Sequence, residues 1–122
     1  MSTVLIVDDD PQIRSWLREL LDAEGHQVIE AGDGNEALAC FHRSHPDLVV
    51  LDIYMPNKDG LETILLLRKI DPDVKILALS GGVIKGYDVY KPAKAFGAQA
   101  ALGKPFSAKE FLTHVDGLLT AH

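Results

Sequence analysis

The sequence predicts an α/β fold: a doubly wound, five-stranded parallel sheet in a three-layer α/β/α sandwich. Short apolar runs alternate five times with segments whose apolar residues recur at helical spacing. One run, residues 48–51, contains no polar residue, as expected of a strand buried on both faces of a parallel sheet. At 122 residues the usual strand order is the flavodoxin-like 2-1-3-4-5, and we expect a single domain over residues 1–122.

The first unit of the predicted fold is a strand over residues 3–7 followed by a helix. Asp10 and Pro11 suit the N-cap and the first turn of this helix, and Gly25 ends it. Apolar residues at helical spacing mark its inner face: Ile13, Trp16, Leu17, Leu20 and Leu21.

The next two units follow the same pattern. Residues 27–31 form a predicted strand, and Asp33 and Glu36 have the spacing of a capping pair for a helix that runs to about residue 44. After the strand at 48–51, a third helix ends at Asp71, because the residue before a proline avoids the helical region. Leu61, Ile64, Leu65, Leu67 and Ile70 mark the third helix, and the apolar run at 64–67 is expected to lie in the core.

Two more strands are predicted, over residues 74–79 and 99–102. Between them the apolar periodicity fails from 83 to 90, and Pro92 interrupts what would otherwise be a regular helix. We therefore expect a long loop, followed by a short helix over residues 91–96.

The final predicted helix has a well-marked beginning. Ser107 and Glu110 have the spacing of a capping box, and Phe106 and Phe111 have that of a hydrophobic staple. Its inward-facing residues are expected to be Phe111, Leu112, Val115, Leu118 and Leu119.

Composition narrows the classes of function. A formal net charge of -6 disfavours binding to a phosphate backbone, so direct nucleic-acid binding is not expected. No apolar run approaches the roughly 18 residues that span a bilayer, and the N-terminus lacks a basic segment followed by an apolar one. The single cysteine, Cys40, fits a reducing compartment. We therefore expect a cytoplasmic protein.

Acidic residues follow two of the buried strands. Asp8 and Asp9 come directly after the first strand, and Asp52 ends the third. Strands 1 and 3 are neighbours in this topology, so the three carboxylates should converge at the edge where open α/β sheets bind ligands. Carboxylates this close repel each other unless a cation joins them, and oxygen-only ligands favour Mg²⁺ or a similar ion such as Mn²⁺.

Ser80 and Lys104 bring a hydroxyl and an ammonium to the same edge, because they follow strands 4 and 5. A carboxylate nucleophile, a metal and a fixed cation are the parts of a phosphoryl-transfer site. Asp10 is interpreted as the helix cap before Pro11 rather than as a further metal ligand.

Four segments of the chain resemble the receiver domain of two-component response regulators, in the order and spacing of that family. They are VLIVDDDPQIR at 4–14, LDIYMPNKDGLE at 51–62, ALS at 78–80 and KPF at 104–106. The resemblance implies that Asp52 is the phosphoacceptor, that Ser80 is the switch hydroxyl and that Lys104 contacts the phosphoryl group. It also implies a cis peptide bond between Lys104 and Pro105.

The same resemblance implies a metal site. Its ligands would be Asp9, Asp52 and the backbone carbonyl of Tyr54, with Asp8 bound through a water molecule. The partner would be a sensor histidine kinase or a phosphotransfer protein, whose phosphohistidine supplies the phosphoryl group. The output would be a conformational change that acts on an effector protein or on a C-terminal output domain outside this chain. Such a domain is a signalling phosphoacceptor, not an enzyme, apart from self-phosphotransfer and slow autodephosphorylation.

The chain departs from the family pattern at three positions. Ala101 replaces the aromatic residue whose rotation usually reports the movement of the switch hydroxyl, Gly82 lacks a side chain that often tunes acyl-phosphate hydrolysis, and Pro92 breaks the fourth helix. We therefore expect switching to depend on ordering of residues 81–90. The rival interpretation is a pseudo-receiver that binds its partner without being phosphorylated. The sequence leaves open whether the domain stands alone or belongs to a longer regulator.

Two other motifs are weaker. Residues 32–37 imitate a dinucleotide-binding turn about 20 residues before Asp52, but the carboxylates of Asp33 and Glu36 would repel a pyrophosphate. Cys40, His42 and His45 have loosely zinc-like spacing, but we expect them at the exposed end of the second helix.

Overall fold

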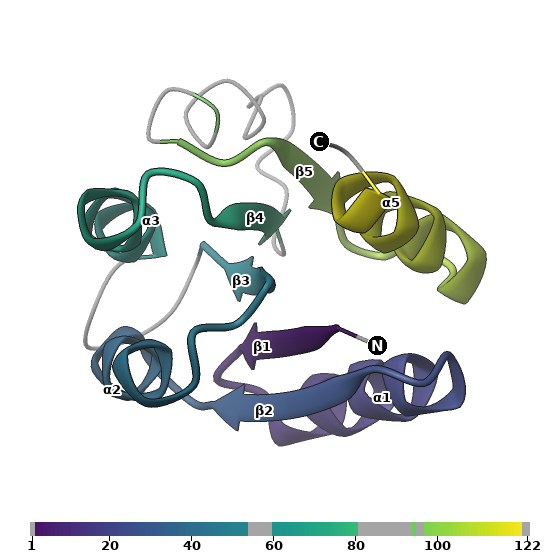
Figure 1. The fold of residues 1–122 in the computed structure, drawn as a ribbon. Coiled ribbons are helices and arrows are strands. Elements are labelled where there is room, and N and C mark those ends of the chain that lie inside the picture. The colour runs from purple at the N-terminus through teal and green to yellow at the C-terminus, as the bar shows by residue number, and fades with distance from the viewer. Residues whose placement is uncertain (1, 54–59, 81–93, 95–96, 121–122) are drawn as a thin grey trace.

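The computed structural model describes residues 2–53, 60–80, 94 and 97–120. Five parallel strands form one sheet in the order β2-β1-β3-β4-β5, so the predicted fold class and strand order are confirmed (Figure 1). The described elements are β1 (Thr3–Val7), α1 (Pro11–Ala23), β2 (Gln27–Ala31), α2 (Gly34–Ser44), β3 (Leu48–Asp52), α3 (Gly60–Ile70), β4 (Lys75–Ser80), β5 (Ala100–Gly103) and α5 (Ala108–Thr120).

Helices cover both faces of the sheet. Helices α1 and α5 lie on one face and α2 and α3 on the other, which gives three layers (Figure 1). Alternate residues of β1 enter different cores: Val4 and Ile6 pack with α1 and α5, and Leu5 and Val7 pack with α2 and α3. Each fully buried aliphatic side chain of this kind contributes about 1.5–3 kcal/mol. Burial on both faces is therefore the reason that the central strands are apolar without alternation.

The beginnings of α1 and α2 are fixed by side chains that the sequence identified. The Asp10 carboxylate accepts a hydrogen bond from the Gln12 amide, and the Asp33 carboxylate accepts one from the Glu36 amide, both at 2.8 Å. Gly25, which follows α1, has a φ of 85°, a left-handed conformation that favours glycine. The predicted caps are confirmed.

The beginning of α5 carries both predicted devices. The Ser107 hydroxyl accepts a hydrogen bond from the Glu110 amide at 3.0 Å, and the Glu110 carboxylate accepts one from the Ser107 amide at 3.3 Å. The rings of Phe106 and Phe111 stack with centroids 5.9 Å apart. The capping box and the staple are confirmed, and together they fix where the chain turns after β5.

Strand ends differ slightly from the prediction. Strand β4 begins at Lys75 rather than at Val74, and β5 runs over Ala100–Gly103 rather than 99–102. Gln99 lies before the strand, and its side-chain oxygen accepts the Ile76 amide at 2.8 Å. The Gln99 amide also donates to the Ile76 carbonyl at 3.1 Å, so one backbone and one side-chain hydrogen bond join the two segments just before β5.

One face of α3 was predicted wrongly. Leu65, which lies in the run expected to be core, is 40% exposed, whereas the buried stripe of this helix contains Thr63, Ile64 and Leu67. Consecutive helical residues point about 100° apart, so a run of apolar residues cannot all face one sheet. The prediction that the whole run at 64–67 lies in the core therefore made the buried face of α3 too wide.

The loop and short helix expected between β4 and β5 lie almost wholly outside the described residues. Lys94 alone is described there, and it is helical and exposed. Within the described ranges, every helix is too short or too polar to cross a membrane.

Candidate functional site

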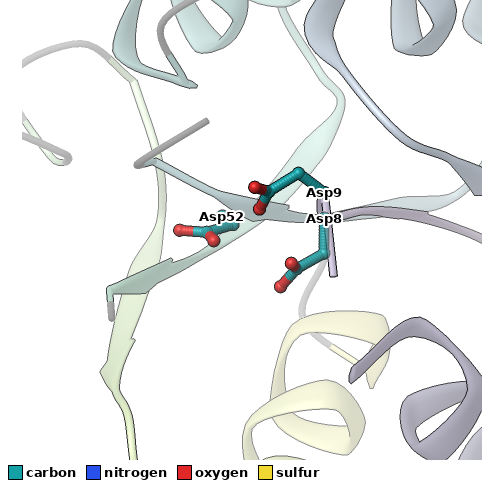
Figure 2. A group of neighbouring side chains, drawn as sticks. All are labelled: Asp8, Asp9 and Asp52. Atoms are coloured by element: carbon teal, nitrogen blue, oxygen red, sulfur yellow. The ribbon is translucent and has the colours of Figure 1, made fainter. Parts of the chain in front are cut away.

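The candidate site is the carboxyl edge of the sheet at β1 and β3. These strands are neighbours, and Val7 of β1 lies opposite Leu51 of β3. The next residues of the two chain segments, Asp8 and Asp52, therefore lie side by side. Asp9 projects to the same place (Figure 2). One carboxylate oxygen from each of the three residues lies within 4.8 Å of the others. The structure thus brings together the three acids that the strand order predicted would meet.

The three carboxylates differ in burial. Asp8 is fully buried and Asp52 is 5% exposed, whereas Asp9 is open to solvent. Buried charge is unfavourable unless it is hydrogen-bonded or paired. In Asp8, Oδ1 accepts the Asp10 amide at 2.9 Å and Oδ2 accepts the Lys104 ammonium at 2.8 Å. Both oxygens of Asp8 therefore have partners within the protein.

Lys104 supplies the positive charge of the site. Its Nζ lies 2.8 Å from Asp8 Oδ2 and 3.3 Å from Asp52 Oδ2, and its side chain is 20% exposed. Burial lowers the pKa of this lysine, but the hydrogen bond to Asp8 and the charge of Asp52 outweigh burial, so the pKa is raised above its ordinary value. Lys104 is therefore held in its charged form beside Asp52.

Ser80 reaches the same edge from β4. Leu79 is opposite Asp52 in the β3–β4 ladder, and Ser80 follows it as the last residue of the strand, 4% exposed. The Ser80 carbonyl accepts the Lys104 amide at 2.7 Å, which fixes the backbone of the lysine to the end of β4. Because β4 and β5 are neighbours in the sheet, Ser80 and Lys104 lie at adjacent strand ends.

Two expectations from the family resemblance concern the backbone. The peptide bond between Lys104 and Pro105 is cis, as expected. The carbonyl of Tyr54, which was expected to bind a metal, lies outside the described residues.

The weaker motifs do not form sites among the described residues. Cys40 is buried against the core, whereas His42 and His45 are exposed, so the expectation that all three lie on the surface is wrong for Cys40. Position 40 shares the inner face of α2 with Ala37 and Phe41, which is why it is covered. At the start of α2, the Asp33 carboxylate already occupies the amide that a pyrophosphate would need.

Sequence reasoning missed one residue at the site. The guanidinium of Arg14 donates a hydrogen bond to the backbone carbonyl of Asp8 at 2.6 Å. The available signal was its position one turn into the helix that follows the acidic residues.

The donor set fits a hard divalent cation. Three carboxylates meet with one ammonium, so negative charge is in excess, and the only group of three or more such ligands in the described ranges is Asp8, Asp9 and Asp52. Carboxylate oxygens without thiolate or imidazole are the ligands that Mg²⁺ prefers.

The fold and this acidic edge define a doubly wound α/β domain with a carboxylate site at its switch point. The family model for the response regulator receiver domain matches residues 4–116. Response regulator MprA from Mycobacterium leprae is 39% identical over 121 residues, which cover 95% of this chain and 50% of the relative. A protein-glutamate methylesterase/protein-glutamine glutaminase from Paramagnetospirillum magneticum is 38% identical over 93% of this chain and 30% of the relative.

A solved structure agrees with the sequence relatives. The crystal structure of the receiver domain of NtrX from Brucella abortus has a TM-score of 0.90 and 30% identity, and covers 98% of this chain and 99% of the other. The chain therefore belongs to the response regulator receiver domain family. It spans half or less of the length of the two curated relatives named above.

Proposed function

We propose that this receiver domain accepts a phosphoryl group on Asp52, with Mg²⁺ bound at the acidic edge, and signals through a change in conformation. The observation that carries the proposal is the meeting of Asp52 with Lys104, Asp8 and Asp9 at one edge of the sheet. A nearly buried carboxylate beside a fixed ammonium is suited to nucleophilic attack on a phosphoryl group, because the ammonium offsets the charge of the incoming oxygens.

Each residue has a distinct role in this proposal. An oxygen of Asp52 attacks phosphorus in line, the bond from phosphorus to the donor histidine breaks, and an acyl phosphate forms on Asp52. Lys104 contacts the transferred phosphoryl oxygens, and Ser80 donates its hydroxyl to them after transfer. The donor is a phosphohistidine on a sensor histidine kinase or a phosphotransfer protein.

The metal ligands are proposed from the family resemblance. Asp9 and Asp52 would hold Mg²⁺, or Mn²⁺, directly with the Tyr54 carbonyl. Asp8 would act through a water molecule, which agrees with both its oxygens accepting hydrogen bonds from the protein. When bound, the ion would supply positive charge to the phosphoryl oxygens and to the acids.

The partners and output are proposed from the family. MprA is about twice as long as the segment matched here, so a C-terminal output domain or a separate effector protein would receive the signal. In this proposal residues 1–122 act as one phosphoacceptor domain in the cytoplasm, with no catalysis beyond self-phosphotransfer and slow autodephosphorylation.

A second candidate is a pseudo-receiver that binds its partner without phosphorylation. The observation that favours it is Ala101, a partly buried residue of β5 that packs against the core where a rotating aromatic side chain is expected. Without that ring, the usual link between the site and the surface is missing.

One experiment separates the two candidates. The chain is incubated with acetyl phosphate and Mg²⁺, and its intact mass is measured. The proposal predicts a gain of one phosphoryl group that requires Mg²⁺ and is lost in Asp52→Asn. No gain in a folded wild-type protein would favour the pseudo-receiver.

A further inference from the structure

We propose that Arg14 is a positioning residue for the acidic site, which holds the peptide between Asp8 and Asp9 so that Asp9 keeps its direction. Arg14 lies in the first turns of α1. Its Nη1 donates to the Asp8 carbonyl at 2.6 Å, and its Nε lies 3.3 Å from Glu30 Oε1. Its side chain is 21% exposed, so the guanidinium is largely removed from water.

The carbonyl of Asp8 lies where strand pairing stops. The ladders of β1 with β2 and with β3 both end at Val7. The Asp8 amide still donates to the Ala31 carbonyl at 3.2 Å, but the Asp8 carbonyl takes its hydrogen bond from a side chain instead. A hydrogen bond on that oxygen fixes the plane of the peptide that leads into Asp9. By holding the Asp8 carbonyl, Arg14 thus restrains the backbone of Asp9, the exposed acid of the site.

Arg14 is itself held in place by an acid of β2. Glu30 Oε1 pairs with Arg14, and Glu30 Oε2 lies 2.6 Å from Nη1 of Arg18. Arg18 is more exposed, at 46%, and its recorded partners are Glu30, Asp22 and the Val28 carbonyl. Both arginines therefore bind the same carboxylate, but within the described ranges Arg14 and not Arg18 contacts the acidic segment. This difference makes Arg18 a matched control.

The inference rests on the proposed function, because it assumes that Asp9 binds Mg²⁺. Outer groups that orient metal ligands typically change affinity by about ten- to a hundredfold when removed. We expect Arg14→Met to raise the Mg²⁺ dissociation constant about tenfold and Arg18→Met to leave it within about twofold. At saturating Mg²⁺, the rate of phosphorylation by acetyl phosphate should fall less in Arg14→Met than the Mg²⁺ affinity does, because Arg14 has no direct role at the phosphoryl group.

The experiment is Mg²⁺ titration calorimetry on the whole chain, with thermal unfolding of each variant. Arg14→Lys keeps the positive charge and a hydrogen-bond donor, so it should recover part of the Mg²⁺ affinity. It replaces Arg14→Met in the comparison if that variant fails to fold. In Mg²⁺-free protein, the amide of Asp10 should exchange faster in Arg14→Met than in Arg18→Met. Equal Mg²⁺ affinities and equal exchange in the two methionine variants would overturn the inference. A wild-type chain that takes up no Mg²⁺ would instead overturn the proposed function and, with it, this role of Arg14.

Discussion

The two edges of the sheet each hold a cation, and the two cations have opposite environments. At the carboxyl edge, Lys104 binds the carboxylates of Asp8 and Asp52, and its pKa is raised. At the amino edge, Arg68 of α3 donates to the carbonyls of Val74 and Gly97, and burial lowers its pKa, although Asp71 and Asp73 partly oppose this. Lys104 thus binds carboxylates whose charges a phosphoryl group or a metal could offset, whereas Arg68 donates mainly to backbone carbonyls.

The aspartates of the two edges differ in the same way. A cavity of about 360 Å³ at the amino edge is lined in part by Asp47, Asp71 and Asp73. Asp47 accepts the Thr3 amide and Asp71 accepts the Asp73 amide, both at 2.9 Å. Asp71 thus caps a turn and Asp47 binds the start of β1, and among the described residues these acids form no metal-ligand group. An acid beside a strand end is therefore not sufficient for a site; burial and convergence with other charges are also needed.

The first test concerns the backbone packing behind Asp52. A methyl group on Gly60 would lie 2.6 Å from the Asp52 carbonyl oxygen and closer still to the Cα of Ile53. We expect Gly60→Ala to lower the free energy of unfolding by about 3 kcal/mol, because the backbone must move apart. Urea denaturation measures the change.

The matched control for Gly60 is Gly117 in α5, where an added methyl group meets nothing within 4 Å. Gly117→Ala should stabilise the protein by about 0.5–1 kcal/mol, since alanine favours a helix interior. Equal effects of the two substitutions would mean that the carboxyl edge is not closely packed.

The second test removes Arg68 from the amino edge. Arg68→Met leaves the carbonyls of Pro72, Val74 and Gly97 without this donor, and we expect a loss of about 2 kcal/mol in the free energy of unfolding. Phosphorylation by acetyl phosphate should continue in the folded variant. Lys69→Met, at an exposed neighbouring position, should be nearly neutral. Loss of phosphorylation in a folded Arg68→Met protein would contradict the view that Arg68 stabilises the fold without acting on the acidic site.

The third test compares one acid from each edge. Asp9→Asn should weaken Mg²⁺ binding by at least about tenfold, because it removes a charged ligand. Added Mg²⁺ should then raise the melting temperature of the wild type more than that of the variant. Asp73→Asn at the amino edge should bind Mg²⁺ like the wild type. A Mg²⁺ affinity that falls equally in both variants would show that the ion responds to general charge rather than to a site.

The fourth and smallest effect is the titration of Lys104. Because its folded-state pKa is raised, its stabilising contribution is fully present below the ordinary lysine value of 10.5 and is lost as the pH rises through the folded-state pKa. NMR detection of the lysine Nζ should show this raised pKa in wild type and a lower one in Asp8→Asn. A Lys104 pKa that is the same in both proteins would contradict the pairing with Asp8.

The local features of the fold could be read from the sequence, and the long-range ones only in part. Asp10, Asp33 and Ser107 were recognised as caps because their partners lie within three residues. The strand order was predicted because 2-1-3-4-5 is a usual order for a doubly wound parallel sheet of this length. That order placed Asp8 and Asp52 at one edge before any geometry was known.

The contacts between distant segments were not predictable in detail. Lys104 binds Asp8 across 96 positions in the sequence, and its distance from each acid depends on how β5 lies beside β4. Periodicity also could not decide which apolar residues of α3 are covered, so Leu65 was placed inside wrongly. Arg14 was missed because its partner is a backbone carbonyl, which the position of Arg14 one turn into the helix does not specify.

The most direct test of the acidic edge as a phosphoacceptor site is to locate the modified residue. The chain is treated with acetyl phosphate and Mg²⁺ and then reduced with borohydride, which converts an aspartyl phosphate to homoserine, and its peptides are sequenced by mass spectrometry. We expect homoserine at position 52 only when Mg²⁺ is present. Homoserine at position 8 or 9 instead, or labelling at position 52 that does not depend on a divalent cation, would contradict this expectation.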